Sequence, residues 1–67
     1  MEIIFNNLTQ QVQEETSVQI VLNNLIGENL KGIAVAVNQV VVPRAQWANH
    51  ILKDSDNVLV IKAAQGG

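Results

Sequence analysis

The sequence has few reactive or metal-binding side chains: its 67 residues include no cysteine, no tyrosine and one histidine. The absence of thiols excludes a disulfide framework, thiolate metal ligands and cysteine nucleophiles. A thiol-free chain suits a reducing compartment, and we therefore expect the protein in the cytoplasm. A domain of this length buries only about 60% of its unfolded surface, so its single core gives a net stability of about 3–5 kcal/mol.

Positive charge is scarce as well. The formal net charge is −2, and the cations Lys31, Arg44, Lys53 and Lys62 are spread along the sequence, which argues against a basic patch. Because nucleic-acid affinity comes from clustered cations that displace counterions, we expect no nucleic-acid partner. No apolar run approaches the roughly 18–20 residues of a membrane span, and no basic region precedes the first apolar residues. We therefore expect no membrane association and no signal peptide.

One segment has a clear helical period, from about residue 18 to Gly27. Its apolar residues share one face of a helix: Val18, Val21, Leu22, Leu25 and Ile26. Thr16 and Ser17 offer side-chain oxygens to the helix start, and Gln19 stands three residues after Thr16, as a capping box requires. Gly27 is expected to end the helix in the left-handed conformation.

Five β-prone segments surround this helix, at residues 1–6, 8–13, 32–37, 40–42 and 58–61. Residues 6–7 and 38–39 suit hairpin turns because asparagine tolerates a positive φ. Segment 8–13 has little apolar content, which is typical of an edge strand, and Pro43 ends the fourth segment because proline cannot donate to a ladder. Residues 45–52 are too few for more than a single helical turn and a connector.

The order β-β-α-β-β-β predicts one α+β domain over residues 1–67, with a mixed sheet of four to five strands packed on one helix. The last strand is apolar on both faces. Alternation alone therefore leaves open which of its side chains are buried.

Candidate catalytic or metal-binding residues are few. Asp54 and Asp56 lie in a polar stretch between apolar segments, where ordinary turn chemistry is expected, and the further oxygen ligands of a calcium loop are missing. His50 has no nucleophile to activate and no second histidine with which to share a metal, so we interpret it as exposed or lightly hydrogen-bonded. We expect no catalytic residue and no metal site.

Trp47 and Arg44 are separated by three positions. We expect Trp47 to close the edge of the small core with its indole N–H facing a carbonyl or water. A contact surface remains the alternative, because tryptophan and arginine are over-represented at interfaces. Arg44 alone is most simply a solvated cation.

The C-terminal end, Ala63-Ala64-Gln65-Gly66-Gly67, has small side chains and no turn partner, which predicts a flexible tail over residues 64–67. Four extended residues reach at most about 13–14 Å, far enough to enter another protein's active site. Glycines have no Cβ, so they can pass a narrow channel and bring the terminal carboxylate beside a reactive phosphate.

The stretch N-x-x-V-V-P-R-x-x-W, from Asn38 to Trp47, is specific, and with the terminal Gly66-Gly67 it resembles the ThiS family over essentially the whole length. These are the sulfur carrier proteins of thiamine biosynthesis, and the resemblance implies the ubiquitin-like β-grasp fold. Many members have Gly-Asp where this chain has Ser55-Asp56. This departure concerns only the type of that turn.

The resemblance also implies a mechanism. An adenylating enzyme related to ubiquitin-activating enzymes uses Mg-ATP to convert the Gly67 carboxylate to an acyl-adenylate. A persulfide sulfur donor then replaces AMP and leaves a thiocarboxylate, from which thiazole synthase takes the sulfur. The chain itself is then a co-substrate and not an enzyme, with no permanently bound cofactor. Gln65, Gly66 and Gly67 enter the partner's active site.

The family commonly has a charged residue between two core positions of the last strand, where this chain has Leu59. The resemblance therefore implies that Val58 and Val60 point inward, while Leu59 and Ile61 form an apolar patch on the open face of the sheet. The predicted partner-docking residues are Leu59, Ile61 and Arg44.

Three alternatives remain. The small subunit of molybdopterin synthase resembles this chain in fold and Gly-Gly end, but is usually longer and lacks the P-R-x-x-W spacing. The chain could instead be a β-grasp interaction module with an inert tail. An enzyme acting through His50 and Asp54 is the least supported.

Overall fold

The computed structural model describes residues 1–27 and 30–62. Their elements follow the expected order: β1 (Glu2–Phe5), β2 (Leu8–Gln11), α1 (Val18–Leu25), β3 (Ile33–Val37), β4 (Val40–Val42), the 3₁₀ helix η1 (Arg44–Gln46) and β5 (Asn57–Lys62). Within these residues, no helix has the length and apolar character needed to cross a membrane. The predicted tail over residues 64–67 lies outside the described residues.

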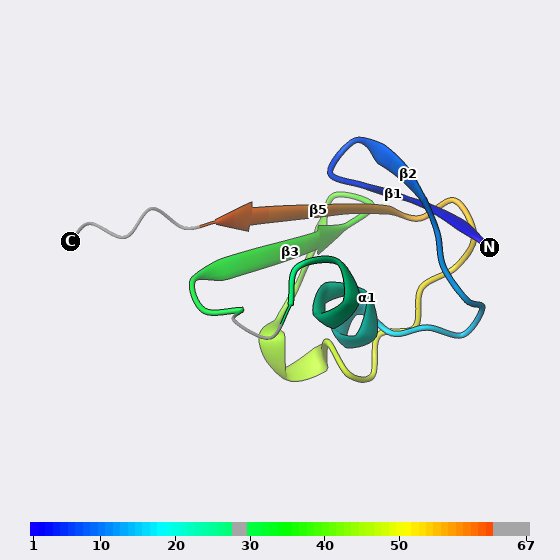
Figure 1. The fold of residues 1–67 in the computed structure, drawn as a ribbon. Coiled ribbons are helices and arrows are strands. Elements are labelled where there is room, and N and C mark those ends of the chain that lie inside the picture. Colours follow the sequence, from blue (N-terminus) through cyan, green and yellow to red (C-terminus); the bar gives the residue numbers. More distant parts are fainter. Residues whose placement is uncertain (28–29, 63–67) are drawn as a thin grey trace.

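The five strands form one mixed sheet in the order β2-β1-β5-β3-β4. β5 is the central strand: it pairs parallel with β1 and antiparallel with β3, while the two hairpins β1-β2 and β3-β4 supply the flanks. The polar second segment is an edge strand, as predicted, although it ends at Gln11 rather than residue 13. This is the expected β-grasp arrangement (Figure 1).

Both hairpin turns use residues that adopt positive φ. The angles are 49° and 69° at Asn6 and Asn7, and 50° and 72° at Asn38 and Gln39. Two successive left-handed residues make the type I′ turn, whose twist matches that of the flanking strands. The predicted turn positions are confirmed.

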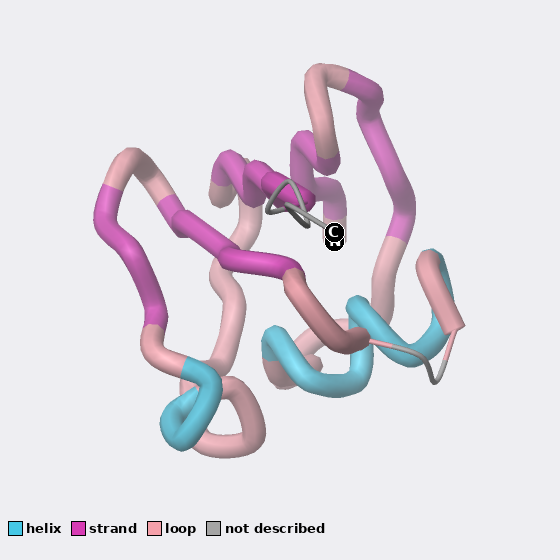
Figure 2. Tube along the Cα trace, turned by 90° about the vertical axis from the view of Figure 1, so that its left-hand side faces the viewer, coloured by secondary structure: helices cyan, strands magenta, loops and turns pink. Residues whose placement is uncertain are grey.

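The helix and the 3₁₀ turn lie on the same side of the strand layer (Figure 2). The core between these layers contains, among others, Ile3, Leu22, Val35, Trp47 and Val58, each at most 1% exposed. The opposite face of the sheet is not covered by any helix of the described residues. Several apolar side chains on that face are exposed, among them Val41, Leu59 and Ile61.

The helix differs from its prediction at its start and in the length of its buried face, whereas Gly27 follows the helix end with a positive φ of 112°, as expected. Ser17 alone is the N-cap and accepts from the N–H of Ile20, whereas the Gln19 side chain donates to Asn23. The capping box predicted from Thr16 is wrong because Thr16 lies one residue too early. Leu25 and Ile26 are 40% and 37% exposed, so the buried stripe is shorter than the period indicated.

Candidate functional site

The candidate site is the central strand β5 and the chain end that follows it. Val58 is fully buried, and five register pairs tie β5 to β3, from Val37 opposite Val58 to Ile33 opposite Lys62. Lys62 is the last described residue, and the strand ends there (Figure 1). Gln65, Gly66 and Gly67, the predicted threading and modified residues, lie outside the described residues and stay predictions.

The side chains of β5 alternate as the family pattern implied. Val58 is buried and Val60 packs partly against the core, whereas Leu59 and Ile61 are 41% and 53% exposed. The pleat of a strand sends successive side chains to opposite faces, and the parallel pairing of Phe5 with Val58 places Val58 on the helix side. The predicted orientation is therefore confirmed.

The strands beside β5 extend this apolar surface. Ala36 lies opposite Leu59, Ala34 lies opposite Ile61, and Val41 lies opposite Ala36 and is 67% exposed. We call these five residues the open-face patch. A hollow next to it is lined by Asn7, Ala36, Gln39, Asn57 and Leu59. Sequence reasoning identified the two β5 members of the patch and missed the other three, which only the strand register brings to them.

The turn that precedes β5 is built on Asp54 and Asp56. Asp54 Oδ1 accepts from the main-chain N–H of Glu2 at 2.9 Å, and Asp56 Oδ2 accepts from that of Lys53 at 2.8 Å. Asp56 Oδ1 also accepts from the Asn38 side chain at 2.9 Å. Carboxylates that satisfy main-chain donors in this way stabilise the turn, which confirms the interpretation as turn chemistry.

A second tie connects this turn to the hairpin of β3 and β4. The Asn38 side-chain oxygen accepts from the N–H of Asn57, and the Asn38 main-chain N–H donates to the Asn57 carbonyl. Ser55 adopts a φ of 71°, the left-handed conformation that glycine takes most readily. The backbone therefore keeps the shape suited to Gly-Asp although a serine is present.

His50 is half-buried, and its main chain forms hydrogen bonds: the His50 carbonyl accepts from the N–H of Val18. His50 and Asp54 line different cavities, and no hydrogen bond joins their side chains in the part of the chain that the structure describes. No group of three or more potential metal ligands occurs among residues 1–27 and 30–62.

Trp47 is 1% exposed, and its indole N–H donates to the Val42 carbonyl at 2.9 Å, as predicted for a residue that closes the core. The Arg44 guanidinium lies 4.6 Å from the Trp47 ring centre and donates to the Leu30 carbonyl. Arg44 is exposed, as expected for a solvated cation, but its head group also contacts an aromatic face and a main-chain oxygen, which the sequence did not indicate. Its role in docking stays a prediction.

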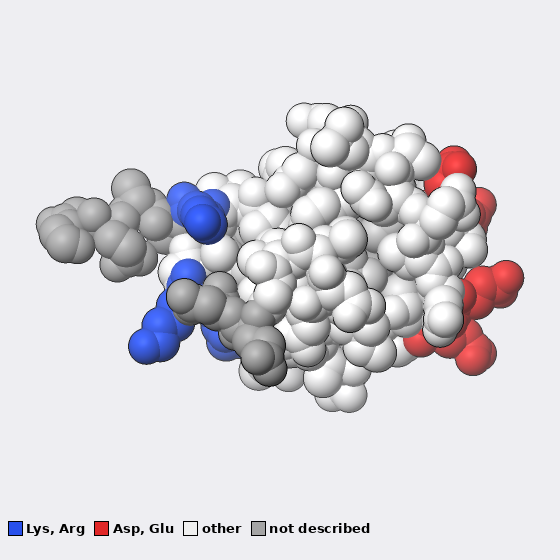
Figure 3. Space-filling model, viewed as in Figure 1, with Lys and Arg blue, Asp and Glu red and all other residues white. Residues whose placement is uncertain are grey.

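The fold also gathers three of the four cations, against the expectation from their spread in the sequence. Lys62 ends β5 opposite Ile33, Lys31 precedes Ile33 by two residues, and Arg44 binds the carbonyl of Leu30. We call these three cations the basic end (Figure 3). The sequence analysis did not consider strand direction. Because β3 and β5 are antiparallel, the start of β3 lies beside the end of β5, which brings Lys31 and Lys62 to the same end of the sheet.

The described carboxylates lie at the other end of β5. Glu14, Glu15 and Asp54 line one cavity. Asp54 accepts from the main-chain N–H of Glu2, and Asp56 lies in the same turn as Asp54. We call these five residues the acidic end; in Figure 3 the acidic side chains in view lie away from the basic ones. Lys53, the fourth cation, lies among the acids.

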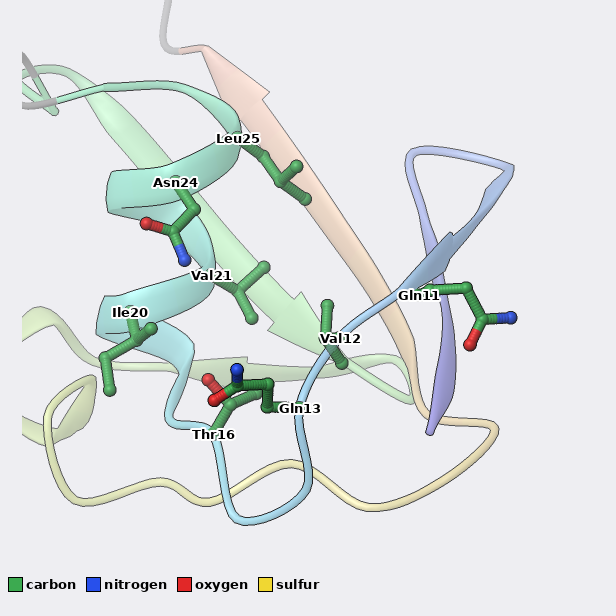
Figure 4. Close-up of a pocket in the computed structure, with 8 residues that line it drawn as sticks. All are labelled: Gln11, Val12, Gln13, Thr16, Ile20, Val21, Asn24 and Leu25. Carbon is green, nitrogen blue, oxygen red and sulfur yellow. The ribbon is translucent and has the colours of Figure 1, made fainter.

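A separate cavity of about 290 Å³ lies between α1 and the segment that follows β2 (Figure 4). Its lining consists of apolar, amide and hydroxyl side chains: Gln11, Val12, Gln13, Thr16, Ile20, Val21, Asn24 and Leu25. Without an ionisable side chain, this lining offers no acid, base or charged ligand for chemistry.

Comparison with known proteins extends these observations. The sequence model of the ThiS family matches residues 2–67. The sulfur carrier protein ThiS of Escherichia coli (strain K12) is 39% identical over 67 residues, which cover 100% of both chains.

Two solved structures from Geobacter metallireducens agree. A crystal structure of a thiamine biosynthesis protein (ThiS) has a TM-score of 0.86 at 25% identity and covers 100% of both chains. A solution structure of a thiamine biosynthesis protein has a TM-score of 0.77 at 25% identity, covering 100% of this chain and 88% of that one. The match over residues 2–67 and the full-length relative together show that the chain belongs to the ThiS family.

Proposed function

We propose that this chain is a sulfur carrier of thiamine biosynthesis, in which the Gly67 carboxylate receives the sulfur and the folded body docks on the partners. The observation that carries the proposal is the full-length match to a sulfur carrier protein by a chain that ends in Gly66-Gly67. Family membership favours this function over that of the molybdopterin synthase subunit.

The chemistry follows from the weakness of a carboxylate as an acyl electrophile. One Gly67 oxygen attacks the α-phosphorus of Mg-ATP in the adenylating enzyme, pyrophosphate leaves, and an acyl-adenylate forms. The terminal sulfur of a persulfide then attacks the acyl carbon and expels AMP. A thiol attacks the donor-side sulfur of the resulting acyl disulfide, which releases the thiocarboxylate and leaves a disulfide on the donor. ATP and magnesium thus belong to the partner's reaction.

The thiocarboxylate is a softer nucleophile than the carboxylate. Thiazole synthase takes this sulfur for the thiazole of thiamine, and the carrier returns as a carboxylate. The chain supplies no acid or base to any of these steps, in keeping with the structural roles of Asp54 and Asp56 described above. Such a chain acts as a protein co-substrate in the cytoplasm and not as an enzyme.

The open-face patch is the proposed docking surface for these larger proteins. Leu59 and Ile61 lie on the strand that leads directly to the chain end, so a partner that covers the patch also receives Gly67. Exposed apolar side chains grouped on one face are typical of protein–protein contact surfaces. The position of β5 thus links recognition to delivery.

The test is an intact-mass measurement after incubation with the cognate adenylating enzyme, Mg-ATP and a persulfide donor. We expect the chain to gain the mass difference between one sulfur and one oxygen, only when ATP is present. A chain without Gly67 is the control and should gain nothing. A wild-type chain that binds the enzyme but never gains mass would support the interaction module with an inert tail.

A further inference from the structure

The basic end lies at the last described residues of β5. Lys62 is the last residue of β5, and only residues 63–67 follow it in the sequence. The acidic end begins at the other terminus of β5, about 17 Å away for five residue steps along a strand. The charged side chains of the described residues are therefore arranged asymmetrically along the direction of the central strand (Figure 3).

We propose that the basic end is a docking surface that steers the carrier, C-terminus first, to an acidic rim around the active-site entrance of the adenylating enzyme. The inference rests on the proposed function and adds a recognition surface distinct from the open-face patch. The side chain of Lys62 leaves the sheet on the same face as Ile33, which packs against the core, whereas Ile61 points to the open face. A partner can therefore contact the two surfaces independently.

The negative net charge indicates that the three cations orient the carrier and do not attract the molecule as a whole to an acidic partner. The chain carries a formal net charge of −2, so an acidic partner repels the molecule as a whole. Only an approach with Lys31, Arg44 and Lys62 in front brings attractive charges closest to the partner. Charge arranged in this way mainly raises the association rate and selects orientation.

The reach of the chain end decides which part of the partner the cations meet. From Lys62 to Gly67 the extended chain spans at most about 18 Å. Exposed charges are screened over about 8 Å at physiological ionic strength. The cations therefore act on the protein surface around the entrance, while the carboxylate is delivered to the nucleotide inside.

The three cations are suited to this role in different ways. Lys31 and Lys62 are exposed. The Arg44 head group is fixed by the Leu30 carbonyl and the Trp47 ring, so little conformational entropy is lost when it meets an anionic partner. Because Arg44 also supports the fold, the test leaves it unchanged.

The experiment measures the association rate constant of the full chain with the adenylating enzyme by stopped flow, at low and high salt. Lys31→Glu and Lys62→Glu are compared with Lys53→Glu, which changes the net charge equally but lies at the acidic end. We expect each of the first two to slow association about fivefold at low salt and less at high salt. Lys53→Glu should stay within about twofold of wild type, because only the approaching end is steered.

Equal slowing by all three variants would show that net charge alone matters and would overturn the proposal, as would the absence of any slowing. Thermal unfolding checks that each variant is folded. If a reversed charge disturbs the fold, Lys31→Gln and Lys62→Gln replace these variants, and both should slow association less than the glutamate variants but in the same direction. The yield of sulfur at the chain end, measured by mass at saturating enzyme, separates the two hypotheses. Unchanged association rates with normal sulfur uptake contradict only the steering, whereas no uptake by wild type contradicts the proposed function.

Discussion

The two faces of the sheet carry similar apolar side chains but have opposite surroundings. Val41 and Val42 are adjacent in β4, yet Val41 is 67% exposed and Val42 is 5% exposed. In β5 the exposed Leu59 stands between the buried Val58 and the half-buried Val60. The helix covers one face, and the open-face patch faces solvent on the other. One face stabilises the fold, and the other is available for recognition.

The largest effect is expected on the covered face at Trp47. Trp47→Ala removes a side chain that is 1% exposed and should cost about 3–5 kcal/mol, as much as the whole stability of a domain this small. We expect no cooperative unfolding transition for this variant by circular dichroism. Trp47→Phe keeps most of the volume but leaves the Val42 carbonyl without its indole donor, and should cost about 1–3 kcal/mol.

On the open face, Leu59→Asp should leave the fold intact and reduce partner binding. The unfolding free energy should change by less than about 1 kcal/mol, because the new carboxylate reaches solvent. Affinity for the adenylating enzyme, measured by calorimetry, should fall at least tenfold, or about 1.4 kcal/mol, because a charge replaces an apolar contact. A variant that unfolds, or one that binds like wild type, would contradict the division between the two faces.

The adjacent valines of β4 give the sharpest matched pair for stability. Val42→Ala should lower the unfolding free energy by about 2 kcal/mol, through two lost buried methyl groups and the cavity they leave. Val41→Ala should change it by no more than about 0.5 kcal/mol, because that side chain is mostly in solvent. Urea unfolding of both variants checks this, and equal losses would show that the open face is covered in solution.

The smallest effect concerns the turn that enters β5. Ser55→Gly should stabilise the domain by about 0.5–1 kcal/mol, because glycine adopts the observed φ of 71° without the clash of a Cβ. Gly27→Ala makes the opposite change at a φ of 112° and should destabilise the domain by about 1 kcal/mol. Thermal unfolding resolves both changes, and a destabilised Ser55→Gly would contradict the interpretation of this turn.

Much of this arrangement could be predicted from the sequence. The order of elements, the two asparagine-containing turns, the edge strand and the buried Trp47 follow from local patterns. The orientation of Leu59 could not be predicted from local patterns, because β5 is apolar on both faces. It was correctly inferred only from the family resemblance. The predicted capping box was wrong because Ser17 is the cap residue and Thr16 lies one residue before it.

The parts that escaped prediction depend on strand pairing. Val41, Ala36 and Ala34 join the open-face patch through register, and Lys31 and Lys62 meet only because β3 and β5 are antiparallel. The contacts of the exposed Arg44 could not be predicted either, because nothing local in the sequence indicates that the Leu30 carbonyl lies within its reach. Contacts between residues far apart in sequence are set by the fold as a whole.

The most direct test of the central claim is to locate the added sulfur in the chain. After incubation with the adenylating enzyme, Mg-ATP and a persulfide donor, tandem mass spectrometry should place one oxygen-to-sulfur exchange on Gly67. The same treatment of Leu59→Asp should give the same product more slowly. Sulfur on any other residue, or none on a folded and enzyme-bound wild-type chain, would contradict the account.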